Sequence, residues 1–194
     1  RMACTGWGGT DLTDPLAIHA IEMIMKDLIP SYNGDMTARD NMHNAQCLAG
    51  MAFSNALLGI VHSMAHKTGA AYSGGHIVHG CANAMYLPKV IQFNAKNPEA
   101  DKRYCEIAAH IGLKPTTDAL IQHIRGLNAK LDIPGGIKDY EGGIIDEKEF
   151  LEKLPKVAEL AVGDACTGSN PRAITPAVME KLLKACYYDL TVDF

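Results

Sequence analysis

Residues 13–29 read TDPLAIHAIEMIMKDLI and carry the clearest secondary-structure signals in the chain. Thr13 and Asp14 are residue types that cap helices, and Pro15 suits the first helical position. The apolar residues that follow do not alternate with polar ones, as those of a half-buried strand would. The stretch therefore predicts a helix, and we expect this helix to end before Pro30.

Signals of the same kind recur along the rest of the chain. Pro98 and the pair Thr175-Pro176 mark two further helix starts. No stretch shows the sustained alternation of β-branched residues that is typical of strands. We expect an all-α fold, a helical bundle, with further helices over the ranges 37–58, 80–96 (bent at Pro88), 98–112, 117–130, 147–162 and 176–188.

A loop rich in glycine, at residues 133–143, divides this bundle. We expect one domain over 1–194 with two lobes, about 1–132 and 144–194. No predicted strand leads into a glycine-rich turn that opens a helix, which is the usual phosphate cradle for a dinucleotide. The pairs Gly8-Gly9, Gly74-Gly75 and Gly142-Gly143 are too short to replace that cradle.

The composition is that of an ordinary globular protein. Of the 194 residues, 47% are hydrophobic and 21% are charged, and the net charge of −4 excludes nucleic acid or an anionic membrane as an electrostatic partner. The apolar stretch 47–64 is interrupted by Ser54, Asn55 and His62, so we do not expect it to span a membrane. The six cysteines form no CxxC pair, which favours reduced thiols and a cytoplasmic protein.

Four of the eight histidines, His62, His66, His76 and His79, lie in the stretch GIVHSMAHKTGAAYSGGHIVHG over residues 59–80. The i, i+4 spacing of the first two puts them on one face of a helix, where two imidazoles can bind one metal ion. Imidazole suits both Zn²⁺ and Fe²⁺. A single helical histidine is more often a surface or hydrogen-bonded core residue, but four in so short a stretch favour a metal site.

Several motifs carry a resemblance to a known family. They are GIVHSMAHKTG at 59–69, HGCANA at 79–84, LP at 87–88, AGMAFSNA at 49–56, DACTGSNPR at 164–172 and ACTG at 3–6. Together they resemble the C-terminal helical domain of iron-containing (group III) alcohol dehydrogenases. The branch that includes butanol and lactaldehyde–propanediol dehydrogenases is the most similar. The resemblance covers essentially the whole chain.

The resemblance implies a site and a reaction. His62 and His79 match two of the family's metal ligands, for Fe²⁺ or Zn²⁺. His66 matches the catalytic histidine that lies beside the nicotinamide of NAD(P) and takes part in proton relay. Phe53 and Cys166 match the substrate pocket, although without the family both are as well explained as core residues. The implied reaction is hydride transfer between NAD(P) and a small primary alcohol or aldehyde, with the metal as a Lewis acid.

Part of the family pattern is missing. The family has a DxxxHAxE motif after ACTG that supplies an aspartate and a histidine as two further ligands, but here the chain runs almost directly into DLTDP at 11–15. His19 imitates that histidine in HAIE, yet Pro15 stands four residues before it, so we do not assign His19 as a ligand. We expect weak metal affinity unless His76, His66 or Asp14 substitutes.

The chain begins at Arg1, and the family's N-terminal nucleotide-binding domain is absent from the sequence. We therefore expect a fragment that is inactive when isolated, and that forms a homo-oligomer or lacks its N-terminal domain as a partner. The alternative is a non-catalytic helical module for metal binding or oligomerisation, because a domain that loses its partner exposes an apolar face.

Overall fold

A computed structural model describes residues 9–69 and 71–194. The predicted ACTG motif at 3–6 and the pair Gly6-Trp7 lie outside the described residues. Within them the chain forms eight α-helices, two short 3₁₀-helices and no strand, so the prediction of an all-α fold is confirmed. In chain order the helices are α1 (Thr13–Tyr32), α2 (Met36–Ala56), α3 (Ile60–Thr68), α4 (His79–Asn94), α5 (Pro98–His110), α6 (Thr117–Lys130), η1 (Ile137–Asp139), α7 (Glu147–Val162), η2 (Thr167–Ser169) and α8 (Pro176–Tyr188).

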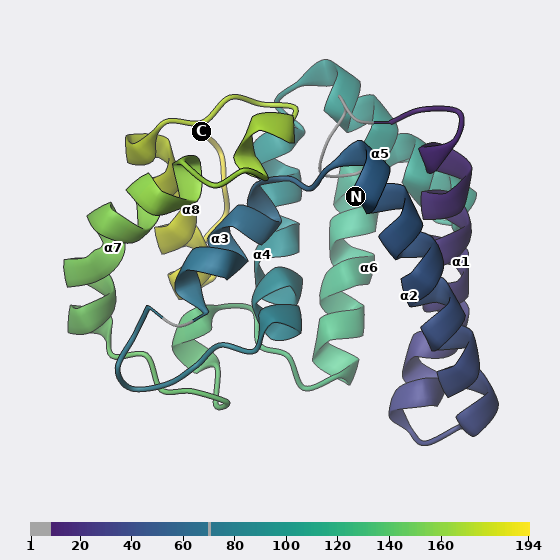
Figure 1. Cartoon of the computed structure of the whole chain (residues 1–194), viewed down its shortest axis with the longest axis horizontal. Helices are drawn as coiled ribbons and strands as arrows, with labels where there is room; N and C mark the ends of the chain where they lie inside the picture. The colour runs from purple at the N-terminus through teal and green to yellow at the C-terminus, as the bar shows by residue number, and fades with distance from the viewer. Residues whose placement is uncertain (1–8, 70) are drawn as a thin grey trace.

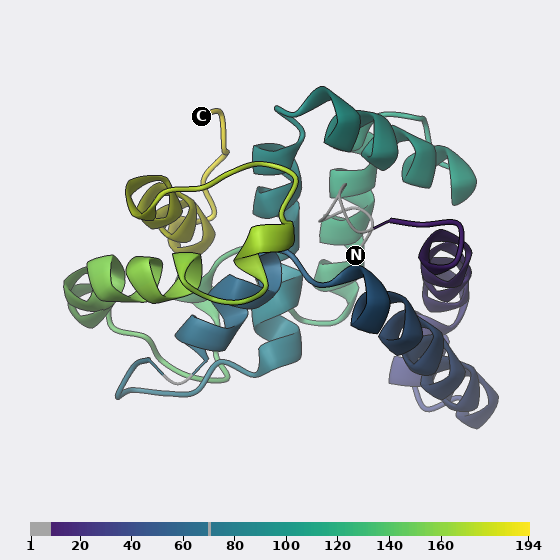
Figure 2. The ribbon, with the colours of Figure 1, turned by 45° about the horizontal axis from the view of Figure 1, so that its top comes forward.

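The helices are arranged around a central pair. Helices α1 and α2 form a hairpin at one end of the molecule, and α7 and α8 lie at the other end (Figure 1). Between them lie α3 and α4, as a second view also shows (Figure 2). Helices α5 and α6 pack against each other and share a buried cluster with α4 and with the α1–α2 hairpin. The stretch that carries the four clustered histidines therefore lies in the middle of the fold.

Side-chain caps determine where several helices begin. The Asp35 carboxylate accepts the backbone N–H groups of Thr37 and Ala38 at 2.9 and 3.0 Å, which starts α2 one residue earlier than predicted. Asn97 caps α5 and Thr116 caps α6 in the same way. These caps satisfy backbone donors that have no partner inside the helix.

Helix α1 corrects two details of the prediction. It begins at Thr13, so Pro15 is not its first residue; the Thr13 hydroxyl accepts the Thr10 N–H at 2.9 Å and fixes this start. It also runs through Pro30 to Tyr32. A proline so close to a helix end removes only one helical hydrogen bond, and the Asn33 N–H still donates to the Ile29 carbonyl at 3.0 Å.

Helices α2 and α3 meet at a sharp corner. Helix α2 ends at Ala56 and is followed by Leu57, whose φ of 62° lies in the region that favours glycine. No single helix of the described chain is long and apolar enough to cross a membrane; α2 and α3 reach that length and composition only together, and they are bent by 105°.

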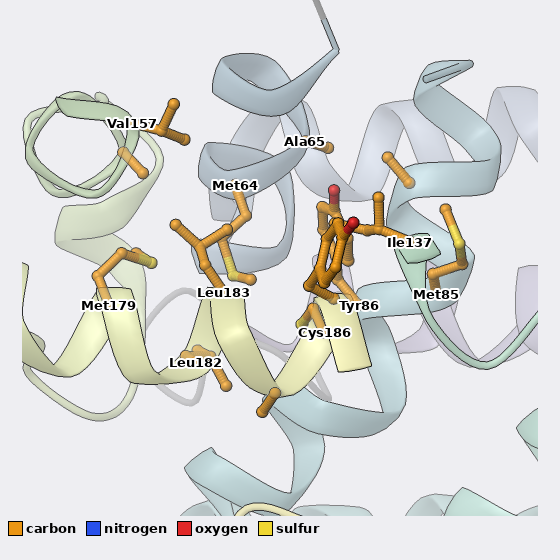
Figure 3. Packing of buried hydrophobic residues seen from close by; sticks show 14 of the residues in the cluster. Met64, Ala65, Met85, Tyr86, Ile137, Val157, Met179, Leu182, Leu183 and Cys186 are labelled. Carbon is orange, nitrogen blue, oxygen red and sulfur yellow. The ribbon is translucent and has the colours of Figure 1, made fainter. Parts of the chain in front are cut away.

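Two buried clusters form the core. The larger one lies between α3, α4, α7 and α8, where Met64 of α3 and Leu183 of α8 approach each other and Tyr86 of α4 lies beside Cys186 (Figure 3). The smaller cluster joins α1, α2, α4, α5 and α6 around Tyr104. Both clusters include residues of α4. The division into lobes at about 1–132 and 144–194 stays a prediction.

Candidate metal centre

Helix α3 carries the first two histidines of the candidate site. It begins directly after Gly59, two residues past the corner at Leu57, and its inner face is buried in the larger core. His62 and His66 lie one turn apart on the outer face, with ring centroids 6.1 Å apart and an angle of 69° between the ring planes. The i, i+4 spacing therefore brings these two imidazoles to the same side of the helix.

A return loop brings the third imidazole to the same place. The Ile77 N–H donates to the Gly69 carbonyl at 3.1 Å, which closes the loop between α3 and α4. His79 is the first residue of α4. Its ring centroid lies 5.4 Å from that of His62 and 5.4 Å from that of His66, and the planes of His66 and His79 differ by only 12°. Three imidazoles from two helices therefore converge.

The spacing of the His62 and His79 rings fits a shared metal ion. The His66 and His79 rings are stacked with nearly parallel planes, so in this arrangement they do not both direct a nitrogen at one ion. Two imidazoles that bind one ion through nitrogens at about 2 Å have ring centres roughly 5 Å apart. Partial burial, and then the nearby His66, lower the pKa of His79, which favours the neutral imidazole that a metal requires. Asn83, one turn further along α4, donates its amide N–H to His79 Nε2 at 2.9 Å. This bond would have to give way to an ion at Nε2.

An apolar cavity of about 280 Å³ adjoins His62. It lies between α1, α2, α3 and α4 and is lined by His62 and Asn83, by Phe53, and by small and aliphatic residues such as Ala20 and Leu87. The Asn83 Oδ1 atom is buried without a hydrogen-bond partner among the described residues. The cavity thus combines apolar walls with one imidazole and one amide side chain.

On its other side, His66 contacts the segment that follows α7. His66 Nδ1 lies 3.3 Å from Asp164 Oδ2, and the Lys67 ammonium lies 2.9 Å from the same oxygen. The Cys166 N–H donates to Asp164 Oδ1 at 3.0 Å. Burial alone would raise the pKa of the Asp164 carboxyl. The hydrogen bonds from Cys166, Lys67 and His66 outweigh this effect and hold the pKa well below its usual range. Asp164 is therefore an anion beside His66.

The structure separates some of the predicted site residues. Phe53 lines the cavity beside His62, whereas Cys166 does not and lies near His66 and Asp164 instead. His76 makes no ring contact with the other three histidines, and its backbone lies against Gly143. The predicted substitute Asp14 is paired with Arg103 at 2.9 Å near the start of α1.

The sequence predicts no role for Asn83, Lys67 or Asp164, although the structure brings all three to the site. Asn83 is four residues after His79, so helical spacing could have indicated it. Asp164 contacts His66 only because the segment after α7 returns to α3, and no local pattern indicates that contact. His19 pairs with Glu22, which also accepts from His110 at 2.8 Å, so it takes part in a surface cluster between α1 and α5.

The model of the Fe-containing alcohol dehydrogenase family, C-terminal, matches residues 4–187. The chain belongs to the Fe-containing alcohol dehydrogenase family. Within this family, the NADPH-dependent butanol dehydrogenase of Clostridium saccharobutylicum is 54% identical over 187 residues, which cover 94% of this chain and 46% of that protein. The predicted resemblance is confirmed.

Two further relatives agree. Aldehyde-alcohol dehydrogenase 2 of Entamoeba histolytica is 40% identical over 194 residues, covering 93% of this chain and 22% of that protein. The structure of the iron containing alcohol dehydrogenase from Thermococcus thioreducens matches with a TM-score of 0.86 and 33% identity, over 96% of this chain and 46% of that chain. The chain thus spans about half the length of the butanol dehydrogenase and of the Thermococcus enzyme, and less than a quarter of the aldehyde-alcohol dehydrogenase.

Proposed function

We propose that this chain is the cation-holding helical part of an alcohol dehydrogenase that interconverts a small primary alcohol and its aldehyde. The observation that supports this most is the convergence of the His62, His66 and His79 rings beside an apolar cavity. The similarity to a butanol dehydrogenase supports the same class of substrate.

His62 and His79 would hold the divalent cation, Fe²⁺ or Zn²⁺. Their rings come from different helices that pack together, so the fold sets their separation without an ion. When bound, the cation supplies a Lewis acid that polarises the oxygen of the substrate. The family's aspartate and histidine ligands are missing from the sequence, and His66 would have to turn out of its stack on His79 to complete the set.

His66 and Asp164 are arranged to hold a proton. Since Asp164 is ionised, the tautomer of His66 that carries its proton on Nδ1 would donate to it, and in that tautomer Nε2 is the acceptor. An alcohol hydroxyl that approaches Nε2 could therefore transfer its proton to the ring, and Asp164 would stabilise the imidazolium that forms. This role and the role of third ligand both need His66 Nε2, so they are mutually exclusive at any moment.

The cavity beside His62 would take the alkyl chain of the substrate. Its volume of about 280 Å³ is at the small end for ligand pockets, which favours a short aliphatic chain. Phe53 and its neighbours supply apolar walls. The predicted pocket role of Cys166 stays a prediction, because Cys166 does not line this cavity.

The hydride carrier does not fit the described residues. A strand with a glycine-rich turn at a helix N-terminus, the usual dinucleotide cradle, does not occur in 9–69 and 71–194. We therefore assign NAD(P) to the half of the full-length relatives that this chain does not span. Residues 1–194 alone should not turn over alcohol.

Relaxation measurements on 1-butanol test the proposed site directly. Paramagnetic Co²⁺ bound to the chain should relax the C1 protons of 1-butanol more strongly than its methyl protons. This selective effect should disappear in His62→Ala and remain in His43→Ala, which removes an exposed histidine of α2. Equal relaxation in all three proteins would contradict a substrate site beside His62.

A second candidate is a non-catalytic module that binds metal or assembles with copies of itself. It is favoured by exposed apolar side chains along α2 and the corner after it, including Met36, Met51 and Leu57. Size-exclusion chromatography with metal analysis separates the two: an oligomer without a histidine-dependent metal ion favours the module.

A further inference from the structure

A second group of metal-binding side chains lies on the far side of His66. His66 Nδ1 or Nε2, a carboxylate oxygen of Asp164 and Cys166 Sγ all lie within 4.8 Å of one another. We propose that His66, Asp164 and Cys166 bind a divalent cation of borderline softness, such as Zn²⁺ or Fe²⁺, at a site separate from the His62–His79 pair.

The fold holds these three side chains in place without an ion. His66 lies in the last turn of α3, whereas Asp164 and Cys166 lie in the segment between α7 and η2. That segment is fixed to α3 through Thr167, whose hydroxyl lies 2.8 Å from the Ser63 hydroxyl and donates to the Ala161 carbonyl at 2.7 Å. The side chains therefore meet through tertiary structure.

The donor set and the spacing suit such an ion. One imidazole nitrogen, one carboxylate oxygen and one thiolate sulfur form a mixed set that zinc and ferrous iron accept. Ligand atoms in a tetrahedral zinc site are roughly 3.5 Å apart, so closing from within 4.8 Å needs movements of about 1 Å. His66 is exposed and can make such a movement, while the Asp164 side chain is only 9% exposed and is held in place. Three protein ligands leave a fourth position open for water.

The Asp164 carboxylate is already paired with two other positively charged or hydrogen-bonding groups. The first is the Lys67 ammonium, 2.9 Å from Asp164 Oδ2; this side chain is 31% exposed and can swing into solvent. The second is the proton that His66 Nδ1 shares with Asp164. Binding therefore releases that proton and the Cys166 thiol proton, and displaces Lys67. An ion at this site would prevent Asp164 from orienting His66 for proton transfer.

This inference does not rest on the proposed function. The two sites differ in their ligand atoms, because only the second contains a sulfur, so each can be measured separately. The His62–His79 pair has imidazole nitrogens only, so an ion bound there shows no sulfur-to-metal charge-transfer absorption. An ion bound by Cys166 does. Loss of one signal therefore leaves the other to be read independently.

Titration of the chain with Co²⁺ under reducing conditions is the test. We expect a sulfur-to-cobalt charge-transfer band that is lost in Cys166→Ser, retained in Cys47→Ser as the matched control, and retained in the double variant His62→Ala/His79→Ala. Circular dichroism checks that each variant folds. No band in the wild-type chain, or an unchanged band in Cys166→Ser, would overturn the proposal.

A lysine variant tests the displacement step. Lys67→Met removes the competing ammonium and should lower the Kd for Co²⁺, read from the same band, several-fold. Lys102→Met, which removes an exposed lysine of α5, should leave this Kd unchanged. A Kd that is unchanged or raised in Lys67→Met would contradict a cation site at Asp164.

Discussion

The ammonium of Lys89 on α4 lies 2.6 Å from Asp189 Oδ1, just after α8, and the Lys89 side chain is only 3% exposed. Arg125 of α6 donates to both oxygens of the same carboxylate, at 2.9 and 2.6 Å. Asp189 therefore links the end of α8 to α4 and α6. Since α4 begins with His79, this pairing helps to fix the helix that carries one residue of the candidate site.

Substitutions in this group should differ strongly in effect. Asp189→Asn leaves the Lys89 charge buried without its counterion, and removing one partner of a buried pair costs about 3–5 kcal/mol. Lys89→Met should cost much less, because Asp189 keeps its two bonds to Arg125. Urea unfolding curves of the two variants measure both free energies. Equal destabilisation would show that the buried Lys89 charge is not the cause.

The same carboxylate predicts a pH dependence. Hydrogen bonds from Arg125 lower the pKa of Asp189 to about 2, against partial burial, and Lys89 adds to the effect. The carboxyl of an unfolded chain titrates near pH 4, so the stability that Asp189 contributes is present above about pH 4 and is lost as the pH falls towards 2. The wild-type chain should lose stability more steeply in this range than Asp189→Asn. Parallel curves for the two proteins would contradict this assignment.

The loop that returns to His79 should be sensitive to added atoms. A Cβ on Gly75 would lie 2.5 Å from the Cα of Gly143, and a Cβ on the neighbouring Gly74 would lie even closer to the Ile144 carbonyl oxygen. Because backbone atoms cannot move aside cheaply, Gly75→Ala should lower stability by roughly 1–3 kcal/mol. Thermal unfolding measures this change.

Gly80→Ala is the matched control for the loop. A Cβ at Gly80 would meet nothing within 4 Å, and Gly80 lies in the first turn of α4. This variant should keep or slightly raise the melting temperature, since alanine favours a helix. If both variants unfold alike, the close approach of the two glycine pairs is not what stabilises the loop.

The corner before α3 should become more stable when its strain is removed. Leu57 has φ 62° and ψ 178°, a combination that is nearly confined to glycine, and its side chain is 59% exposed. Leu57→Gly should therefore stabilise the chain, by up to about 1 kcal/mol. The same change at Leu160, an exposed residue of α7, should destabilise it by about 1 kcal/mol. Changes of the same sign at both positions would contradict strain at Leu57.

Local signals predicted the helices well because they reflect local physics. Caps and N-terminal prolines placed the starts of α5 at Pro98 and α8 at Pro176. The ends were harder to predict: Pro30 was expected to stop α1, but the last turn is held by backbone bonds from residues beyond it. The corner at Leu57 was not predicted, because a leucine with positive φ has no sequence signature.

The candidate site could be predicted from the sequence only as far as helical spacing and family motifs reach. They brought His62, His66 and His79 into one hypothesis, and the structure places these three rings 5.4–6.1 Å apart. They could not give the pairing of His66 with Asp164, or the Gly75–Gly143 contact that closes the loop. Both depend on how the segment around α7 packs against α3 and the loop after it.

The central claim is that the rings of His62 and His79 share one cation, and ring ¹H–¹³C NMR during a Zn²⁺ titration of the Cys166→Ser chain tests it. That background removes the sulfur ligand of the second site. We predict that the two ring signals shift together and reach saturation at the same Zn²⁺ concentration, and that His79→Ala abolishes the response of His62. Independent shifts, or an unaltered response of His62 in His79→Ala, would contradict a shared ion.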